Sequence, residues 1–140
     1  VFVLLLSITV YQVEDKATFT RTLSWFILIG SLLEYLTQLA QLLQWTFLFA
    51  NLVYPVPAGG RPIGNILQPN QAAFIYALGI AAACYLQDIK IKLDTSQQIM
   101  ESSRRLLTVV FGLSVLILAS GIAISASRTG MVLAIAAIVG

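Results

Sequence analysis

Apolar runs of bilayer length constrain the fold of this chain more than any other feature. Five apolar runs, separated by short polar segments, cover residues 1–13 (truncated), 23–43, 70–87, 106–124 and 131–140 (truncated). A helix that crosses the hydrocarbon core of a bilayer needs roughly 20 residues. The second and fourth runs meet this length directly, and the third meets it when Gln68 to Gln87 is counted as one segment.

The composition supports a membrane protein. Hydrophobic residues make up 59% of the chain and charged residues only 10%, and the mean hydropathy is +0.90. A typical soluble domain has about 25% charged residues. We therefore predict an all-α fold, a polytopic transmembrane helical bundle. Because the first and last apolar runs are truncated, we expect residues 1–140 to be a partial membrane domain, a fragment of a larger multi-pass protein.

The distribution of basic residues predicts an orientation. Six of the eight basic residues lie on alternate polar segments, namely Lys16, Arg21, Lys90, Lys92, Arg104 and Arg105. Because positive residues accumulate on cytoplasmic loops, we expect these segments to face the cytoplasm. The other two segments, about residues 44–71 and 125–130, then face outward. Each of them contains one charged residue, Arg61 in the first and Arg128 in the second.

The segment from Gly59 to Gln71, with the sequence GGRPIGNILQPNQ, combines helix-breaking residues with polar side chains. Its closely spaced glycines and prolines interrupt a helix. Irregular backbone near membrane depth survives only where protein or water satisfies its polar groups. The segment is typical of a reaction or binding site at a membrane face. Its polar side chains, which offer hydrogen bonds that a connecting turn does not need, are Arg61, Asn65, Gln68 and Asn70.

Both outward arginines lie where helices are expected to begin. The third helix would begin near Asn70, a good N-cap after Pro69, and the fifth near Thr129. Free backbone N–H groups at such ends favour anions, and arginine can bind phosphate oxygens through two parallel hydrogen bonds. This pattern favours a diphosphate at the outer leaflet. The alternative is that each arginine reaches lipid headgroups or caps a neighbouring helix.

A stripe of polar residues lies on one face of the second span. Because that face cannot contact lipid, it indicates either a proton or substrate path or hydrogen bonding between helices, and we favour the second interpretation. Glu34 lies near the midpoint between Trp25 and Trp45, where an ionised carboxylate needs an aqueous cavity or a cationic partner and should otherwise be protonated. The stripe consists of Ser24, Ser31, Glu34, Gln38 and Gln41, with Thr37 beside it.

The outward segments lack the usual metal-binding and catalytic side chains. They contain no Asp, Glu or Cys, and the chain contains no His. We therefore expect no metal site, no cofactor and no general base within these segments. The sequence also lacks a phosphate-binding glycine loop and an aromatic and basic surface for nucleic acid. If chemistry occurs at the outer face, we expect residues beyond Gly140 to supply part of it.

The two arginine-bearing segments together resemble a known family. The sequence GRPIGNILQPNQA, from Gly60 to Ala72, is followed one hairpin later by SASRTG, from Ser125 to Gly130. This combination resembles the bacterial protein O-oligosaccharyltransferases, also called pilin or protein glycosylation ligases. These enzymes share a membrane superfamily with the O-antigen ligases and the polysaccharide polymerases. The matching residues are Arg61, Gly64, Asn65, Gln68, Pro69, Asn70, Ser127, Arg128, Thr129 and Gly130.

The resemblance implies a multi-pass glycosyltransferase of the bacterial inner membrane, with the motif loops facing the periplasm. Such an enzyme transfers an oligosaccharide from a polyprenyl-diphosphate carrier to serine or threonine hydroxyls of an exported acceptor protein such as pilin. It works in contact with membrane lipid, and neither a cofactor nor a nucleic acid takes part. Arg61 and Arg128 would be the catalytic residues that contact the diphosphate. The substrate-binding residues would be Asn65, Gln68, Asn70, Ser127 and Thr129.

One position departs from the family pattern. Family members commonly carry a histidine directly after the QPN sequence, where this chain has Gln71. Any role of that imidazole is therefore not carried over to this chain. A second important histidine of the family follows a large periplasmic loop, which we expect beyond Gly140. We accordingly expect residues 1–140 to be inactive by themselves.

The sequence is also compatible with other functions. An O-antigen ligase or a polysaccharide polymerase would use the same donor, with a lipid-linked core sugar or a growing glycan as the acceptor. The extended first motif favours the protein ligase over these two. A membrane transporter or a lipid-binding membrane protein would instead make the Glu34 stripe its central feature. Transport predicts a second broken helix in an inverted repeat, which is not visible in these residues.

Overall fold

The structure, a computed structural model, describes residues 15–45, 47, 52–56, 60–62, 64–66, 68–94, 101–125 and 128–139. These residues form helices and connecting segments, without a strand among them. The elements are α2 (Lys16–Leu42), the short 3₁₀-helix η3 (Gly64–Ile66), α3 (Pro69–Asp94), α4 (Glu101–Ser125) and α5 (Arg128–Val139).

Three of the helices are long and apolar enough to cross a membrane. They are α2, α3 over the range Pro69–Ile89, and α4 over the range Arg105–Ser125. The structure confirms the predicted all-α fold, and the length and composition of these three helices agree with a transmembrane bundle. The first apolar run, residues 1–13, lies outside the described residues, and the fifth run falls within α5, which has 12 residues.

The helix α2 begins well before the apolar run that predicted it. Its first turn contains Lys16, and Asp15 caps it, because the Asp15 carboxylate accepts a hydrogen bond from the Thr18 N–H at 3.0 Å. An aspartate at this position satisfies one of the free N–H groups of the first turn and favours the positive end of the helix dipole. The polar residues before Leu23 therefore continue the helix.

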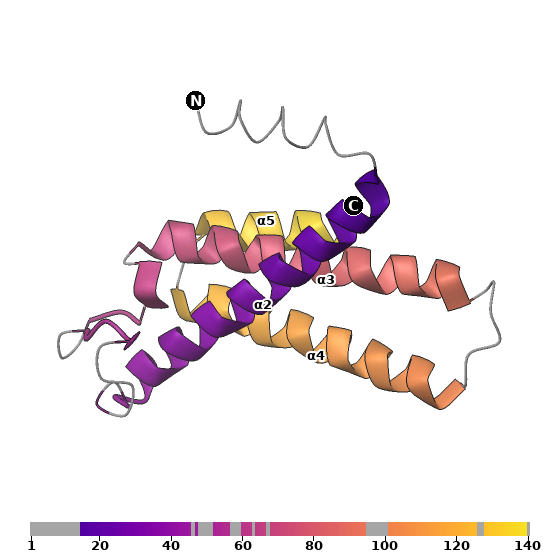
Figure 1. The fold of residues 1–140 in the computed structure, drawn as a ribbon. Coiled ribbons are helices and arrows are strands. Elements are labelled where there is room, and N and C mark those ends of the chain that lie inside the picture. Colours follow the sequence, from indigo (N-terminus) through magenta and orange to yellow (C-terminus); the bar gives the residue numbers. More distant parts are fainter. Residues whose placement is uncertain are drawn as a thin grey trace.

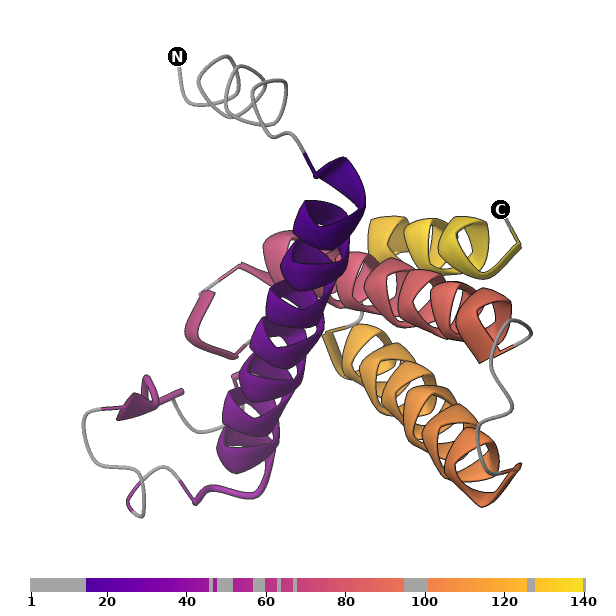
Figure 2. The same ribbon diagram turned by 45° about the vertical axis from the view of Figure 1, so that its right-hand side comes forward.

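The helix α3 is at the centre of the bundle. It packs against α2 on one side and against α4 and α5 on others, and α5 runs alongside it (Figures 1 and 2). Small residues allow this close approach. A Cβ at Gly79 would lie only 2.6 Å from the Ser31 side chain of α2 and 2.8 Å from Leu118 of α4. The fully buried core between these helices includes Ala72, Ala73, Tyr76, Ile80, Ala83 and Leu118.

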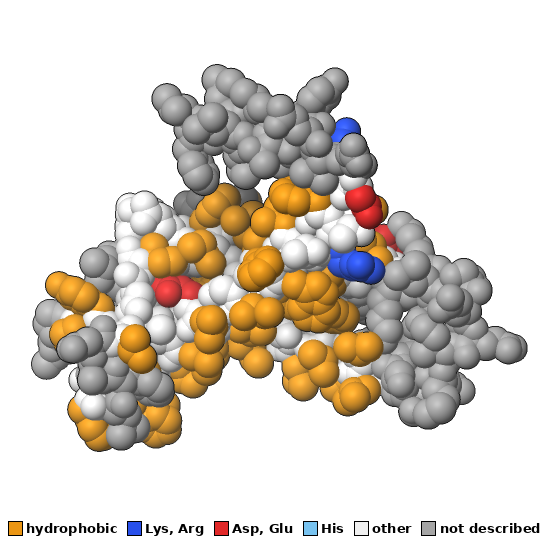
Figure 3. Space-filling model, in the orientation of Figure 1, with side chains coloured by type: hydrophobic (Ala, Val, Ile, Leu, Met, Phe, Trp, Pro, Cys, Tyr) orange, Lys and Arg blue, Asp and Glu red, His pale blue; other side chains and the backbone are white. Residues whose placement is uncertain are grey.

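Hydrophobic side chains cover much of the outer surface. Figure 3 shows them spread over the visible face of the helices, with few charged side chains between them. Large apolar residues are exposed on both α2 and α4, including Phe26 at 70% and Leu116 at 68%. Such a surface suits the hydrocarbon of a bilayer, which agrees with the lengths of the three candidate spans.

The two motif segments lie at the same end of the bundle. There α2 ends and α3 and α5 begin, at the left in Figure 1, with η3 and the preceding segment beside them. The beginnings of α2 and α4 and the end of α3 lie toward the opposite end. The N-terminus of α3, which follows Arg61 in the sequence, and the N-terminus of α5, which contains Arg128, therefore lie at the same end of the bundle.

Candidate functional site

The outward segment around η3 lies against the polar stripe of α2. Gln41, which is buried, pairs with Gly64 in both directions: its Nε2 donates to the Gly64 carbonyl oxygen at 2.8 Å, and its Oε1 accepts from the Gly64 N–H at 2.8 Å. The Gln41 Nε2 also donates to the Tyr54 carbonyl oxygen at 2.9 Å. One amide side chain thus satisfies backbone groups that no helix or sheet satisfies here.

Glycine is required at position 64 for two reasons. Its φ is +68°, in the left-handed region that side chains other than glycine rarely adopt. A Cβ there would overlap the Glu34 carboxylate and would lie 3.2 Å from Thr37 Oγ1. The segment therefore approaches α2 as closely as backbone alone permits.

Glu34 bonds to the same segment. Its Oε1 accepts from the Ile66 N–H at 3.2 Å, and the Thr37 hydroxyl lies 3.4 Å from its Oε2. The sequence indicated that an ionised Glu34 needs an aqueous cavity or a cation. The structure gives the Glu34 side chain hydrogen-bond donors from the loop backbone and from its own helix, and a pocket of about 310 Å³ lies beside it.

Gln38 joins three elements. It is fully buried, and its Nε2 donates to the Pro62 carbonyl oxygen at 3.0 Å and, at a longer 3.4 Å, to the Gly121 carbonyl oxygen of α4. Its Oε1 makes no hydrogen bond within the described part of the chain. Gln38 thus lies between the segment that carries Arg61 and the last turns of α4.

The favoured interpretation of the stripe, bonding between helices, is only partly right. Ser31 does bond in this way, since its hydroxyl donates to the Ile75 carbonyl oxygen of α3 at 2.9 Å. Glu34 and Gln41 bond to the irregular segment instead, and Gln38 bonds to both the segment and α4. The sequence contained one signal for this arrangement. Backbone rich in glycine and proline near a membrane needs polar partners, and the stripe was the nearest set.

Asn65, a predicted substrate-binding residue, is engaged within the loop. Its Nδ2 donates to the Leu52 carbonyl oxygen at 2.6 Å, and its Oδ1 accepts from the Tyr54 N–H at 2.9 Å. The amide therefore ties the motif to the segment that precedes it by about a dozen residues. Substrate binding by Asn65 stays a prediction, to which the structure adds this role in loop architecture.

The start of α3 differs from the prediction. Asn70 was expected to cap the helix, but the helix begins at Pro69, and the Gln68 carbonyl oxygen accepts from the N–H groups of Gln71 and Ala72, both at 3.1 Å. Proline is favoured at a first helical position because its missing N–H has no partner to lose there. Gln68 and Asn70 are both exposed at this end of the helix, where a ligand could reach them.

The structure describes the side chain of Arg61 and, for Arg128, the helical backbone. Arg61 is exposed on the segment before η3. The helix α5 begins at Arg128, one residue before the expected start at Thr129, but the side chains of both residues lie outside the described part of the structure. Ser127 also lies outside it. The structure thus brings the two motif segments to one end of the bundle without defining a distance between the guanidinium groups.

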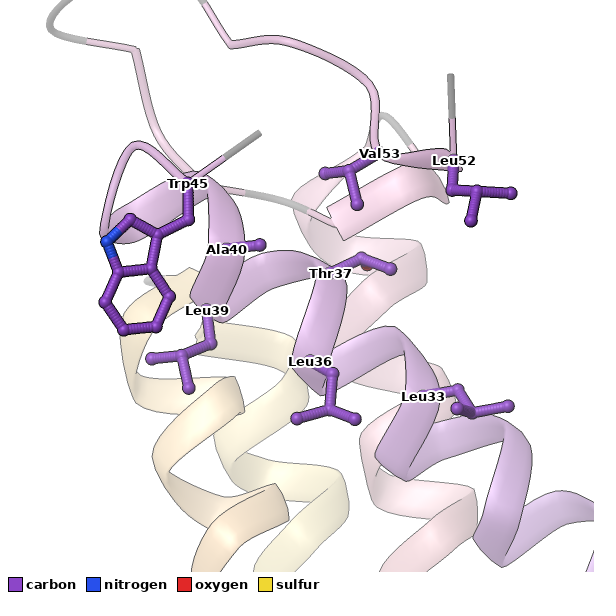
Figure 4. A pocket seen from close by; sticks show the side chains of 8 residues that line it. All are labelled: Leu33, Leu36, Thr37, Leu39, Ala40, Trp45, Leu52 and Val53. Atoms are coloured by element: carbon purple, nitrogen blue, oxygen red, sulfur yellow. The ribbon is translucent and has the colours of Figure 1, made fainter. Parts of the chain in front are cut away.

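An apolar pocket of about 300 Å³ borders the motif segment. Its walls come from the last turns of α2 and from the segment that Asn65 holds (Figure 4). A second pocket, of about 310 Å³, lies between α2 and α3 and has Glu34 and Ser31 in an otherwise mainly apolar lining. Apolar linings of this kind suit hydrocarbon chains better than sugars. The first pocket is lined by Leu33, Leu36, Thr37, Leu39, Ala40, Trp45, Leu52 and Val53.

The described residues offer no cluster for a metal ion. Among them, no group of three or more His, Cys, Asp or Glu side chains lies close enough together to hold one. The polar groups that the described residues present at the motif end include the exposed guanidinium group of Arg61 and the exposed amides of Gln68 and Asn70. A guanidinium group suits an anionic ligand, and an amide can both donate and accept a hydrogen bond.

Comparison of the chain with models of protein families, with curated proteins and with solved structures gave no match. The family resemblance therefore stands on the two motif segments themselves. What the geometry adds is that both segments lie at one end of the bundle and that the first is fixed to α2 by buried hydrogen bonds.

Proposed function

We propose that this chain belongs to a glycosyltransferase of the bacterial inner membrane that transfers an oligosaccharide from a polyprenyl-diphosphate carrier to serine or threonine hydroxyls of an exported protein such as pilin. One observation carries the proposal most directly. The two segments that resemble the family motifs, far apart in the sequence, are adjacent to helix N-termini at the same end of a membrane-sized bundle.

The arrangement suits a reaction in which a diphosphate leaves. The acceptor hydroxyl attacks the anomeric carbon and gives its proton to a general base, the bond from that carbon to the diphosphate oxygen breaks, and the diphosphate keeps the electron pair. Its charge rises as the bond breaks, so fixed donors stabilise the transition state more than the ground state. Arg61, Arg128 and the starts of α3 and α5 are the groups that we assign to this role.

The proposed orientation follows from the basic residues. Lys16 and Arg21 lie in the first turns of α2, and Arg105 lies near the start of α4, at the end of the bundle opposite to the motif segments. Positive residues favour the cytoplasmic side. The motif end then faces the periplasm, where exported proteins meet lipid-linked glycans.

The test is transfer activity of arginine variants in the native protein, expressed from its own gene in the membrane. We expect Arg128→Ala to abolish transfer and Arg61→Ala to lower its rate by roughly 100- to 1000-fold, the effect of losing one donor to developing charge. Arg21→Ala, at the other end of the bundle, is the matched control and should transfer normally. Transfer is read as a mass shift of the acceptor, and normal transfer by Arg128→Ala would refute the assignment.

The acceptor and the orientation are tested separately. A pilin-type protein, a lipid-linked core sugar and a growing glycan are offered as acceptors, and modification of the protein alone is the expected result. For orientation, Gly60→Cys in a Cys84→Ala background is labelled with a maleimide that cannot cross membranes. Labelling from the cytoplasmic side would exclude the proposed periplasmic site.

A further inference from the structure

Gln38 is placed where one side chain can hold both motif segments. Its amide nitrogen has two hydrogens and lies within bonding distance of two backbone oxygens from different parts of the chain. One belongs to Pro62, the residue after Arg61, at 3.0 Å. The other belongs to Gly121, at 3.4 Å, one turn before the end of α4 at Ser125.

Packing alone does not account for glutamine at this position. The Gln38 side chain is fully buried, and its Oε1 has no hydrogen-bond partner within the described residues. A buried carbonyl oxygen without a partner is unfavourable, whereas an apolar side chain of similar size would avoid that penalty. What an apolar side chain cannot do is donate hydrogen bonds to the loop and to α4.

The backbone at Gly121 is suited to this contact. A Cβ there would lie 3.0 Å from the rings of both Tyr35 and Tyr76, so a side chain would require the rings or α4 to shift by a few tenths of an ångström. A helical carbonyl oxygen has a second lone pair that can accept from a side chain. The close approach therefore brings the last turns of α4 within reach of the Gln38 amide.

We propose that Gln38 is a positioning residue that fixes the Arg61 segment relative to the end of α4, and hence relative to the start of α5 at Arg128. Its consequence for catalysis rests on the proposed function, but its consequence for geometry does not. Its two hydrogen bonds go to backbone carbonyl oxygens, those of Pro62 and Gly121. It acts by holding the backbone next to each motif.

The geometric arm of the test measures a distance. Spin labels are attached at Gly60→Cys and Met131→Cys in the native protein with Cys84→Ala, and the distance between them is measured by pulsed electron paramagnetic resonance. We expect Gln38→Met to shift the mean of the measured distance distribution and to broaden the distribution. Gln87→Met, on the far part of α3, is the matched control, and labels at Leu36→Cys and Leu116→Cys test whether α2 and α4 keep their packing.

The kinetic arm measures transfer by the same variants without labels. Misplacement of one arginine should lower kcat by roughly 10- to 100-fold with little change in KM, because the donor still binds while the leaving diphosphate is less well stabilised. A merely structural role would lower the amount of folded protein and leave kcat per folded molecule unchanged. Gly121→Ala, which should displace α4, is a second variant with the same expected direction in both arms.

The outcomes separate the two proposals. An unchanged Gly60 to Met131 distance in both Gln38→Met and Gly121→Ala overturns the positioning role. A changed distance with reduced kcat supports that role and agrees with the proposed function. A changed distance in a protein whose Arg128→Ala variant transfers normally upholds the positioning role and removes the proposed function. If Gln38→Met does not fold, the Gly121→Ala distance decides.

Discussion

The two halves of α2 are built on different principles. In the first half, taken as Lys16 to Ser31, Leu28 and Ser31 face α3, and the close contacts are mainly of apolar and small side chains, with one hydrogen bond from the Ser31 hydroxyl to α3. In the second half, Glu34, Gln38 and Gln41 face irregular backbone, and the close contacts are hydrogen bonds of about 3 Å with defined donors and acceptors. One helix thus packs against its neighbours along its first half and supports the candidate site along its second half.

The two kinds of contact should respond differently to substitution. Apolar packing loses free energy gradually as volume changes, and similar side chains can replace one another. A buried hydrogen bond fails when either partner is lost, because the remaining group keeps its desolvation cost. Variants in the second half should therefore lower the free energy of unfolding more than matched variants in the first half.

The largest effect is expected for Gly64→Ala. The left-handed backbone alone costs a non-glycine residue about 1–3 kcal/mol, and the added Cβ would also overlap the Glu34 carboxylate. Gly30→Ala, in the first half of α2, is the control, because a Cβ there meets no atom within 4 Å. We expect Gly64→Ala to lower the thermal unfolding temperature in detergent and to abolish transfer, whereas Gly30→Ala should do neither. Equal unfolding temperatures for both variants would contradict the structure of the segment.

The next effect is expected for Gln41→Leu. This change removes both hydrogen bonds to Gly64 and leaves its buried N–H and carbonyl groups without these partners, at about 1–3 kcal/mol for each unsatisfied group. Ser24→Ala is the matched change in the first half, where the hydroxyl, among the described residues, bonds only to the Thr20 carbonyl oxygen of its own helix at 2.8 Å. We expect Ser24→Ala to remain within about 0.5 kcal/mol of the parent. Denaturation in detergent measures both, and a Gln41→Leu protein as stable as Ser24→Ala would remove the contrast.

A smaller effect of opposite sign is expected for Tyr76→Phe. The Tyr76 side chain is fully buried in the apolar core, and its hydroxyl makes no hydrogen bond within the described residues. Removing a buried hydroxyl that has no partner should stabilise the protein by about 1 kcal/mol. The measurement is again thermal unfolding in detergent, with Tyr35→Phe as the control. A lower unfolding temperature for Tyr76→Phe would mean that the hydroxyl has a partner in the native membrane protein.

The smallest effect concerns the exposed start of α2. The hydrogen bond from the Thr18 N–H lowers the pKa of Asp15 from its usual 3.8. A group with a lowered folded pKa contributes stability above the unfolded pKa and loses it as the pH falls through the folded value. We therefore expect the Thr18 amide signal in nuclear magnetic resonance spectra to titrate below about pH 3.8 as the first turn loosens, with the core unaffected. In Asp15→Asn, which keeps a good cap, this titration should vanish, and its persistence would assign it to another group.

The sequence predicted the parts of this fold that follow from hydrophobic pattern. The runs at 70–87 and 106–124 lie within long helices of the bundle, the run at 23–43 does so except for its last residue, Leu43, and the polar stripe lies on an inward face as its spacing required. Helix ends were less predictable, because they depend on local caps. Asp15 extends α2 to Lys16, and the Gln68 carbonyl oxygen and Pro69 replace the expected cap at Asn70.

The sequence indicated which residues belong to the candidate site, but it did not indicate which other residues they contact. Arg61 and its neighbours stood out because polar and helix-breaking residues interrupt apolar sequence. That Gln41 binds Gly64 could not be predicted, since the pairing joins residues 23 positions apart and depends on how an irregular segment folds back. The role of Gly121 has no local signal either, because its contact with Gln38 depends on the packing of α4 against α2.

The two hydrogen bonds of Asn65 affect how mutagenesis of the first motif should be interpreted. Because its amide holds the backbone of Leu52 and Tyr54, replacing it would release one wall of the apolar pocket as well as the turn beside Arg61. An Asn65 variant would therefore be inactive whether Asn65 supports the loop or contacts a ligand. Loss of function at an exposed residue such as Arg61 reports on chemistry more directly than loss of function at Asn65.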